Sequence, residues 1–211
     1  MPSRKYEEEQ WANDKLLLGC DEAGLGSLSG PQFVAGCVFP AGYDFSALDG
    51  LNDSKKLTEE KRFELEPLIK RDAVKWFIVE TTAAEFNAAD NCYWLRFFAL
   101  QDYITQHLAE FPPNIMTLMD GDKALKIDGL ENKNLTKGDL HCYTIAAASV
   151  LAKTAKDRQM IALDKEFPQY GWAQNKGYGS PKHQEAIRKF GLTPHHRIKY
   201  CSRILEEEGS E

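Results

Sequence analysis

Two adjacent carboxylates, Asp21 and Glu22, lie between an apolar run at residues 16–18 and a glycine-rich turn. A second apolar run, residues 33–39, follows the turn, so the turn joins two predicted strands. Because side chains alternate along a strand, the two carboxylates lie on opposite faces of the predicted sheet. Carboxylates beside bare glycine backbone can hold a divalent cation while a phosphate approaches closely. The alternative is that Asp-Glu only begins a turn.

Two further acids could join this pair. Asp120 ends a short apolar run that predicts a buried strand, although Asp-Gly is also an ordinary turn signal. Asp157 lies in an alanine-rich stretch that predicts a long helix. On that helix Ser149, Lys153 and Asp157 recur at four-residue spacing and therefore share one face. A Lys–Asp pair at this spacing is commonly a solvated ion pair, so this face matters for chemistry only if it meets the strand ends.

Four carboxylates supply the hard oxygen ligands that Mg²⁺ and Mn²⁺ prefer. Two such ions can activate a water molecule and stabilise the leaving oxygen in phosphodiester cleavage. The histidines offer no H-x-x-x-H spacing for zinc, and no G-x-S-x-G nucleophile elbow occurs. A strand rather than a helix follows the glycine turn, and no G-K-[ST] occurs, so dinucleotide and P-loop sites are both excluded.

Composition indicates one core of ordinary size, since the chain has 211 residues, of which 43% are hydrophobic, and a net charge of −6. Its five cysteines are odd in number and include no C-x-x-C pair, which indicates reduced, packed thiols. The charged N-terminus MPSRKYEEEQ resembles neither a signal peptide nor a membrane span. These features predict a cytoplasmic protein without a membrane partner.

The segment from residue 176 to 203 is basic in a protein that is acidic overall. Its only acid is Glu185, and its basic residues are interleaved with aromatic ones. The basic residues are Lys176, Lys182, Arg188, Lys189, Arg197, Lys199 and Arg203. Such a segment is typical of a surface that binds a phosphate backbone. The alternative is a basic surface over aromatic residues that belong to the core.

The chain divides into a loosely held arm (1–14), a catalytic core (15–168), and a C-terminal basic-aromatic helical region with an acidic tail (169–211) that belongs to the same domain. The first three strands, the last of them at residues 75–82, predict an antiparallel meander. Thr58 caps a helix that Pro67 is expected to kink or split. Residues 91–110 predict a buried helix, and residues 130–139 predict one edge strand.

Several motifs together resemble the bacterial ribonuclease HII family, the type 2 ribonucleases H, over residues 16–200. They are GCDEAGLGSLSGP, LNDSKKLTEEKR, MDG, AAASVLAKTAKDRQM and YGWAQNKGYGSPKH. The resemblance implies an α/β ribonuclease H-like fold with a mixed five-stranded sheet, flanking helices and a small helical C-terminal region. It also implies an endonuclease that cuts the RNA strand of RNA–DNA hybrids and cuts 5′ of ribonucleotides embedded in duplex DNA. The products would carry 3′-hydroxyl and 5′-phosphate ends, as in ribonucleotide excision repair.

The resemblance also implies roles for individual residues. The catalytic, metal-binding acids for two Mg²⁺ or Mn²⁺ ions would be Asp21, Glu22, Asp120 and Asp157. The substrate contacts would be Gly24, Leu25, Gly26, Ser54, Lys55, Ser149, Lys176 and Tyr178, with the tyrosine packing against the deoxyribose at the junction. The family usually has Gly-Arg-Gly where this chain has Gly-Leu-Gly, so we expect altered affinity or altered substrate preference.

Other interpretations stay open at this point. Leu25 could leave a hybrid-only ribonuclease with weak junction activity, or the chain could be a catalytically weak nucleic-acid-binding module. A type 3 ribonuclease H is disfavoured because residues before the first strand leave no room for an extra substrate-binding domain. A metal-dependent exonuclease would differ in releasing products from strand ends. The expected partners are RNA–DNA hybrids and DNA that contains ribonucleotides, bound by a monomer.

Overall fold

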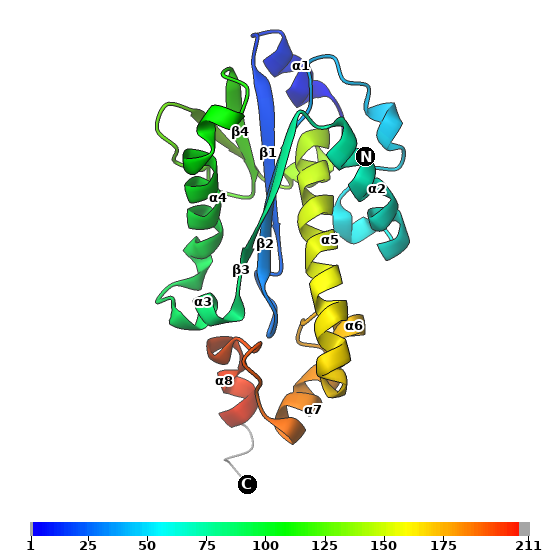
Figure 1. Ribbon diagram of the computed structural model, residues 1–211, viewed down its shortest axis with the longest axis vertical. Helices are drawn as coiled ribbons and strands as arrows, with labels where there is room; N and C mark the ends of the chain where they lie inside the picture. Colours follow the sequence, from blue (N-terminus) through cyan, green and yellow to red (C-terminus); the bar gives the residue numbers. More distant parts are fainter. Residues whose placement is uncertain (1, 207–211) are drawn as a thin grey trace.

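The computed structural model describes residues 2–206, which form a five-stranded sheet with helices on both faces (Figure 1). The strand order is β3-β2-β1-β4-β5. The first three strands pair antiparallel, whereas β4 pairs parallel with both β1 and β5, so the predicted mixed sheet is confirmed. The strands are β1 (Leu16–Ala23), β2 (Gln32–Val38), β3 (Lys75–Thr81), β4 (Ile115–Asp120) and β5 (Glu131–Leu135).

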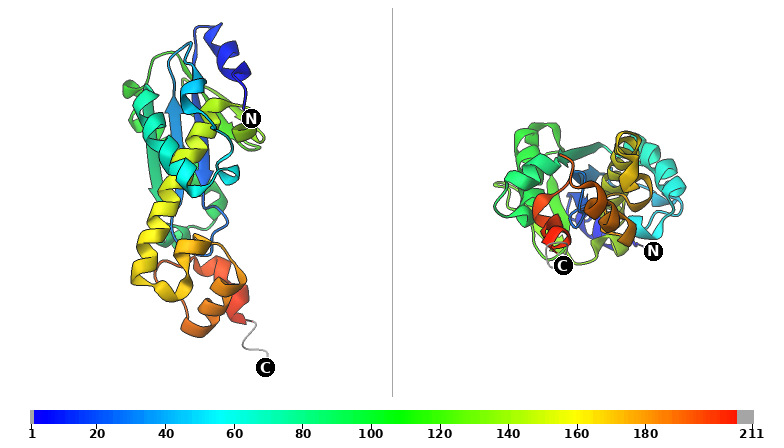
Figure 2. Two further views of the ribbon diagram at one scale, coloured as in Figure 1. Left: turned by 90° about the vertical axis from the view of Figure 1, so that its right-hand side faces the viewer. Right: turned by 90° about the horizontal axis from the view of Figure 1, so that it is seen from below.

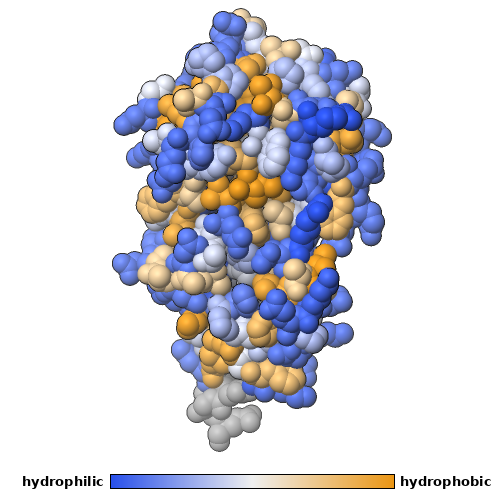
Figure 3. Space-filling view, viewed as in Figure 1, coloured by the Kyte–Doolittle hydropathy of each residue, from blue (hydrophilic) through white to orange (hydrophobic). Residues whose placement is uncertain are grey.

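Helix α5 (Tyr143–Glu166) crosses one face of the sheet and α4 (Leu95–Gln106) covers the other (Figure 1). The helix α5 lies unusually close to β1, because a Cβ atom placed on Gly19 would meet the backbone carbon of Thr144 at 2.6 Å. The small side chains of the α5 alanines also allow this helix to pack closely against β2. Helix α2 (Glu59–Asp72) packs beside α5. Apolar side chains gather around the middle of this view, over the edge strand β3 between α4 and α5 (Figure 3).

The C-terminal helices lie beyond the end of the sheet, around the last turns of α5 (Figure 2). They are α6 (Trp172–Asn175), α7 (Pro181–Phe190) and α8 (Ile198–Glu206). Met160 and Leu163 of α5 pack with Trp172, Ile187 and Cys201 in one buried cluster. The predicted small helical C-terminal region is therefore confirmed, while residues 207–211 of the predicted acidic tail lie outside the described residues.

The prediction of a loosely held N-terminal arm is wrong, because α1 (Lys5–Trp11) is a helix that packs against the sheet. Glu7 is buried, and its Oε1 accepts hydrogen bonds from the backbone N–H and the hydroxyl of Thr144 at 2.8 and 2.9 Å. A tertiary contact to α5 therefore orders a segment whose polar composition indicated none. Asn13 also donates to the Glu9 carbonyl and supports the end of this helix.

Two helix predictions also need correction. Thr58 caps α2 by accepting from the Lys61 N–H, as predicted, but Pro67 lies inside an uninterrupted helix. The stretch predicted as one helix over residues 91–110 is a 3₁₀ turn, then α4, then a second 3₁₀ turn. The side chain of Asn91 accepts from Tyr93 N–H and so favours a separate first turn. A further short helix, α3 (Ala83–Ala88), follows β3.

The five cysteines are all free and buried, as predicted. Over residues 2–206, no helix combines the length and apolar character needed to cross a bilayer.

Candidate active site

Asp21 and Asp120 meet at one end of two parallel strands. The register of β1 and β4 pairs Cys20 with Met119, so the next residue of each strand is an acid. Asp21 lies inside its strand, because β1 continues to Ala23 and stays paired with β2. Its carboxylate is nearly buried and accepts from the N–H of the next residue at 2.7 Å. The two carboxylates therefore lie on paired strands in the interior of the sheet.

Glu22 lies on the opposite face of β1, as the alternation predicted. Its carboxylate forms an ion pair of 3.2 Å with Arg96 of α4. The guanidinium of Arg96 in turn stacks on the ring of Tyr93, 4.3 Å from its centroid. This support from α4 fixes the direction of the Glu22 side chain at the strand end.

Asp139 is a fourth acid at this site that sequence reasoning missed. It lies in the 3₁₀ turn Gly138–Leu140, just before α5, and is 6% exposed. The preceding N–H, that of Gly138, donates to Asp120 Oδ1 at 2.6 Å and brings the turn to the strand end. Burial, and then the charges of Asp120 and Asp53, raise the pKa of Asp139 to about 6. The sequence signal was a Gly-Asp pair in the short turn that precedes the long helix.

Burial and mutual repulsion govern the titration of the other acids. Burial raises the pKa of Asp21 well above its usual value, and the charges of Glu22 and Asp120 raise it further. Burial also raises the pKa of Glu22 and of Asp120, although Arg96 opposes the shift at Glu22 and the Gly138 N–H opposes it at Asp120. Crowded carboxylates of this kind are stabilised by a bound cation.

These carboxylates fit a hard divalent cation by donor chemistry. Within residues 2–206, no three histidine, cysteine, aspartate or glutamate side chains already stand in coordinating geometry. The repulsion that raises their pKa values also opposes closer approach. A cation would therefore draw the carboxylates together when it binds.

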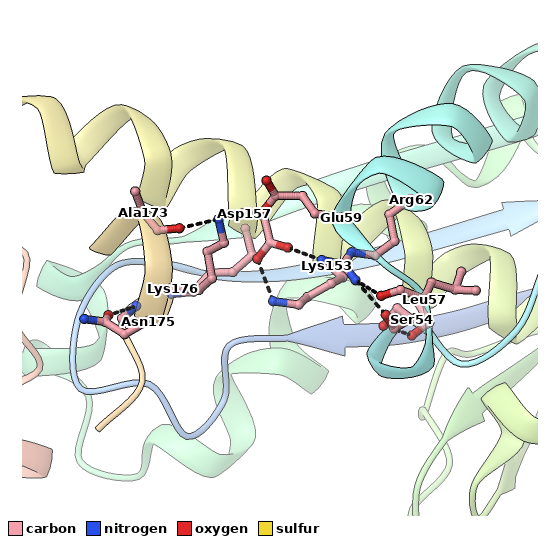
Figure 4. A network of polar contacts seen from close by, with 12 residues as sticks. Ser54, Leu57, Glu59, Arg62, Lys153, Asp157, Ala173, Asn175 and Lys176 are labelled. Carbon is pink, nitrogen blue, oxygen red and sulfur yellow. Dashed lines mark hydrogen bonds and ion pairs between the residues drawn. The ribbon is translucent and has the colours of Figure 1, made fainter. Parts of the chain in front are cut away.

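Asp157 is paired with two basic side chains. Its fully buried carboxylate accepts from Arg62 at 2.7 Å and from Lys153 at 2.6 Å, so both oxygens are engaged (Figure 4). Arg62 also donates to the backbone carbonyls of Ser54 and Leu57. The structure therefore brings together three of the four predicted acids and gives Asp157 a different environment.

A cleft of about 520 Å³ opens beside the acids. It is lined by Glu22, Ala23, Gly24, Leu25, Gly26, Ser54, Lys55, Arg62, Lys153 and Tyr178. Six of the eight predicted substrate contacts are thus on its wall. Partial burial lowers the pKa of Lys55, but nearby carboxylates, Asp21 first, raise it by more, so its ammonium is held charged at the rim.

Ser149 and Lys176, the other two predicted contacts, are placed differently. Ser149 is buried, hydrogen bonds the Ser54 hydroxyl at 2.8 Å, and supports the carboxylate of Asp21. Lys176 forms an ion pair of 2.6 Å with Glu59 and donates to the Ala173 carbonyl (Figure 4). Both side chains therefore support the walls of the cleft from within the protein.

The basic surface is also smaller than the sequence predicted. Arg197 is 1% exposed and donates to the loop carbonyls of Gly24, Leu25 and Gly30. Its charge serves internal hydrogen bonds, so the count of basic residues overestimates the charge offered to a phosphate backbone.

Comparison with known proteins identifies the family. The family model described as Ribonuclease HII matches residues 18–204. The chain belongs to the ribonuclease HII family. Ribonuclease HII of Porphyromonas gingivalis is 40% identical over 188 residues, which are 89% of this chain and 90% of that protein. Ribonuclease HII of Parabacteroides distasonis is 41% identical over 194 residues, which are 92% of this chain and 93% of that protein.

Solved structures share the fold. The structure of the PCNA:RNase HII complex from Archaeoglobus fulgidus matches with a TM-score of 0.72 at 24% identity, covering 87% of this chain and 94% of that chain. Bst-RNase HIII in complex with Mn²⁺ matches with a TM-score of 0.71 at 18% identity, covering 93% of this chain and 71% of that chain. These matches confirm the predicted ribonuclease H-like fold.

As a member of the ribonuclease HII family, the chain is a type 2 ribonuclease H, an endonuclease that hydrolyses the RNA strand of RNA–DNA hybrids. Dependence on a divalent metal is a property of this family.

Proposed function

We propose that this enzyme also cuts on the 5′ side of a ribonucleotide embedded in duplex DNA and leaves 3′-hydroxyl and 5′-phosphate ends. The observation that carries the proposal is the position of the acids beside a cleft whose wall includes the backbone of residues 24–26. Glycine on either side of Leu25 permits close approach by a ribose, whose 2′-hydroxyl is what distinguishes it from deoxyribose.

The residues that would hold two Mg²⁺ or Mn²⁺ ions are Asp21, Glu22, Asp120 and Asp139. Asp139 replaces Asp157 in this set for two reasons. The charge of Asp120 raises the pKa of Asp139, and the N–H of Gly138, the residue before Asp139, donates to Asp120. When bound, the ions supply an activated water and stabilise the leaving oxygen. Ser149 and Arg96 orient the ligands from opposite faces of the sheet.

The cleft wall supplies the substrate contacts. Lys55, Lys153 and Arg62 offer positive charge to the phosphates, and Lys153 does so while it remains paired with Asp157. Tyr178, 38% exposed, offers its ring to a sugar. Leu25 can use only its backbone for polar contacts, so recognition of the ribose falls to the main chain.

Cleavage of two labelled substrates tests the proposal. One is a DNA duplex with a single ribonucleotide, and the other is an RNA strand paired with DNA; each is incubated with Mg²⁺ and then with Mn²⁺. The proposal predicts a single cut 5′ of the ribonucleotide, besides cleavage of the hybrid. Cutting confined to the hybrid would refute it.

A hybrid-preferring enzyme is the second candidate, because Leu25 lies in the cleft without a charged side chain. The variant Leu25→Arg separates the two: we expect it to raise single-ribonucleotide cleavage relative to hybrid cleavage. An unchanged ratio would show that this side chain does not tune substrate choice. The monomeric state stays a prediction.

A further inference from the structure

The loop of residues 24–31 is held from the side away from the cleft by a buried arginine. Arg197 donates from Nη1 to the carbonyls of Gly24 and Leu25, at 2.7 and 2.8 Å, and from Nε to the carbonyl of Gly30 at 3.1 Å. Its guanidinium lies 3.8 Å from the ring centroid of Phe86. The side chain therefore binds three carbonyls of one loop on an aromatic platform.

A second buried basic side chain completes this support. Lys156 of α5 donates to the carbonyls of Ser29 and Pro31, at 3.1 and 2.9 Å. Within residues 2–206, neither Lys156 nor Arg197 has a carboxylate oxygen within 4.0 Å. Loop carbonyls thus accept hydrogen bonds from both side chains, and a loop whose carbonyls are needed by two buried basic groups has little freedom to change shape.

The direction of these carbonyls fixes the direction of the N–H groups. In a trans peptide the C=O and the following N–H point oppositely, and this chain has no cis peptide bond over the described residues. Since the carbonyls of Gly24 and Leu25 point at Arg197, the N–H groups of Leu25 and Gly26 point away from it. Residues 24–26 line the cleft on that side, and within residues 2–206 neither N–H donates to another group.

We propose that Arg197, supported by Phe86, is a positioning residue that aims the N–H groups of Leu25 and Gly26 at the 2′-oxygen of an embedded ribonucleotide. This inference rests on the proposed function. It assigns the discrimination between ribose and deoxyribose to a side chain that never touches the nucleic acid. The phosphates are left to Lys55 and Lys153, whose side chains line the same cleft.

The test measures binding in EDTA, so that no cleavage is required. Fluorescence anisotropy gives the Kd for a duplex with one ribonucleotide and for the same duplex in all-DNA form. Arg197→Lys keeps the charge but loses the fork that reaches three carbonyls. We expect the Kd for the all-DNA duplex divided by the Kd for the ribonucleotide duplex to fall about fivefold to tenfold. This corresponds to the loss of roughly one to two hydrogen bonds to the ribonucleotide, while the Kd for the all-DNA duplex stays unchanged. Hydrogen exchange should become faster at the loop N–H groups of Leu28 and Gly30, which donate to the carbonyls of Gly177 and His195.

Arg71→Lys is the matched control, because Arg71 is an exposed arginine on α2 that, within residues 2–206, pairs with Asp72 alone. Phe86→Leu removes the aromatic platform and should shift the ratio in the same direction; it decides the question alone if Arg197→Lys does not fold. An unchanged ratio, an equal loss on both duplexes, or a wild-type enzyme that binds both duplexes equally would overturn the inference. A wild-type enzyme that discriminates in binding but does not cut would instead refute the proposed function.

Discussion

Asp157→Asn and Asp139→Asn are predicted to have opposite effects on stability. Asp157 is fully buried between Arg62 and Lys153, whose side chains are 9% and 15% exposed. Asparagine keeps the shape of the side chain but removes its charge, which leaves two nearly buried cations without a counter-ion. Asp139 instead lies beside Asp120 and Asp53, so removing its charge relieves repulsion.

The magnitude follows from the cost of breaking a buried ion pair, about 3–5 kcal/mol. A domain of this size loses about 2–4 °C in Tm for each kcal/mol, so Asp157→Asn should lower Tm by roughly 10 °C. Its folded fraction should keep metal-dependent turnover. Asp139→Asn should leave Tm unchanged or raised, while turnover is lost.

Thermal unfolding followed by circular dichroism, with and without Mg²⁺, measures both effects. A cation that binds the folded state raises Tm, and we expect this rise in the wild type and in Asp157→Asn but a much smaller one in Asp139→Asn. A different result would make Asp157 a metal ligand: Asp157→Asn would then lose turnover and the Mg²⁺ effect, while its Tm fell by no more than about 2–4 °C.

Three further predictions follow. Asp21→Asn should abolish turnover with an unchanged circular dichroism spectrum; retained activity would exclude it as a ligand. Gly19→Ala should lower the unfolding free energy by about 1–3 kcal/mol in urea titrations, because its Cβ would meet the Thr144 backbone. Burial lowers the pKa of His196 to about 4, so the unfolded chain takes up its proton first, near pH 6.5. Stability should fall by up to about 3 kcal/mol from pH 6.5 to 4, and less in His196→Asn, whose amide oxygen can still accept the Thr193 N–H; equal pH profiles would contradict this.

Alternation along one strand was enough to place Asp21 and Glu22 on opposite faces, because period-two geometry is local. The same holds for the Thr58 cap. Asp139 could not be found this way, since its neighbours Asp120 and Asp53 come from other parts of the chain.

The four-residue spacing of Lys153 and Asp157 correctly predicts that both lie on one face of the helix, but it does not predict the ion pair with Arg62. That side chain arrives from α2 and turns an ordinary surface pair into a buried network. Arg197 shows the same limit: a basic residue in a basic segment was expected at the surface, whereas loop carbonyls and Phe86 enclose it. Patterns in sequence identify candidates, and tertiary contacts decide which of them meet.

Helix α5 is one continuous helix that connects the part of the cleft beside the sheet with the part formed by Tyr178 of the C-terminal region. Its first turns contact β1, its middle carries Ser149 and Lys153, and its last turns pack with the helices that follow Tyr178. A helix advances 1.5 Å and turns about 100° for each residue. One residue inserted between Ser149 and Met160 would rotate the C-terminal helices by that angle about the axis of α5 and shift them along it. The number of residues in this stretch is therefore fixed as firmly as the identity of the acids.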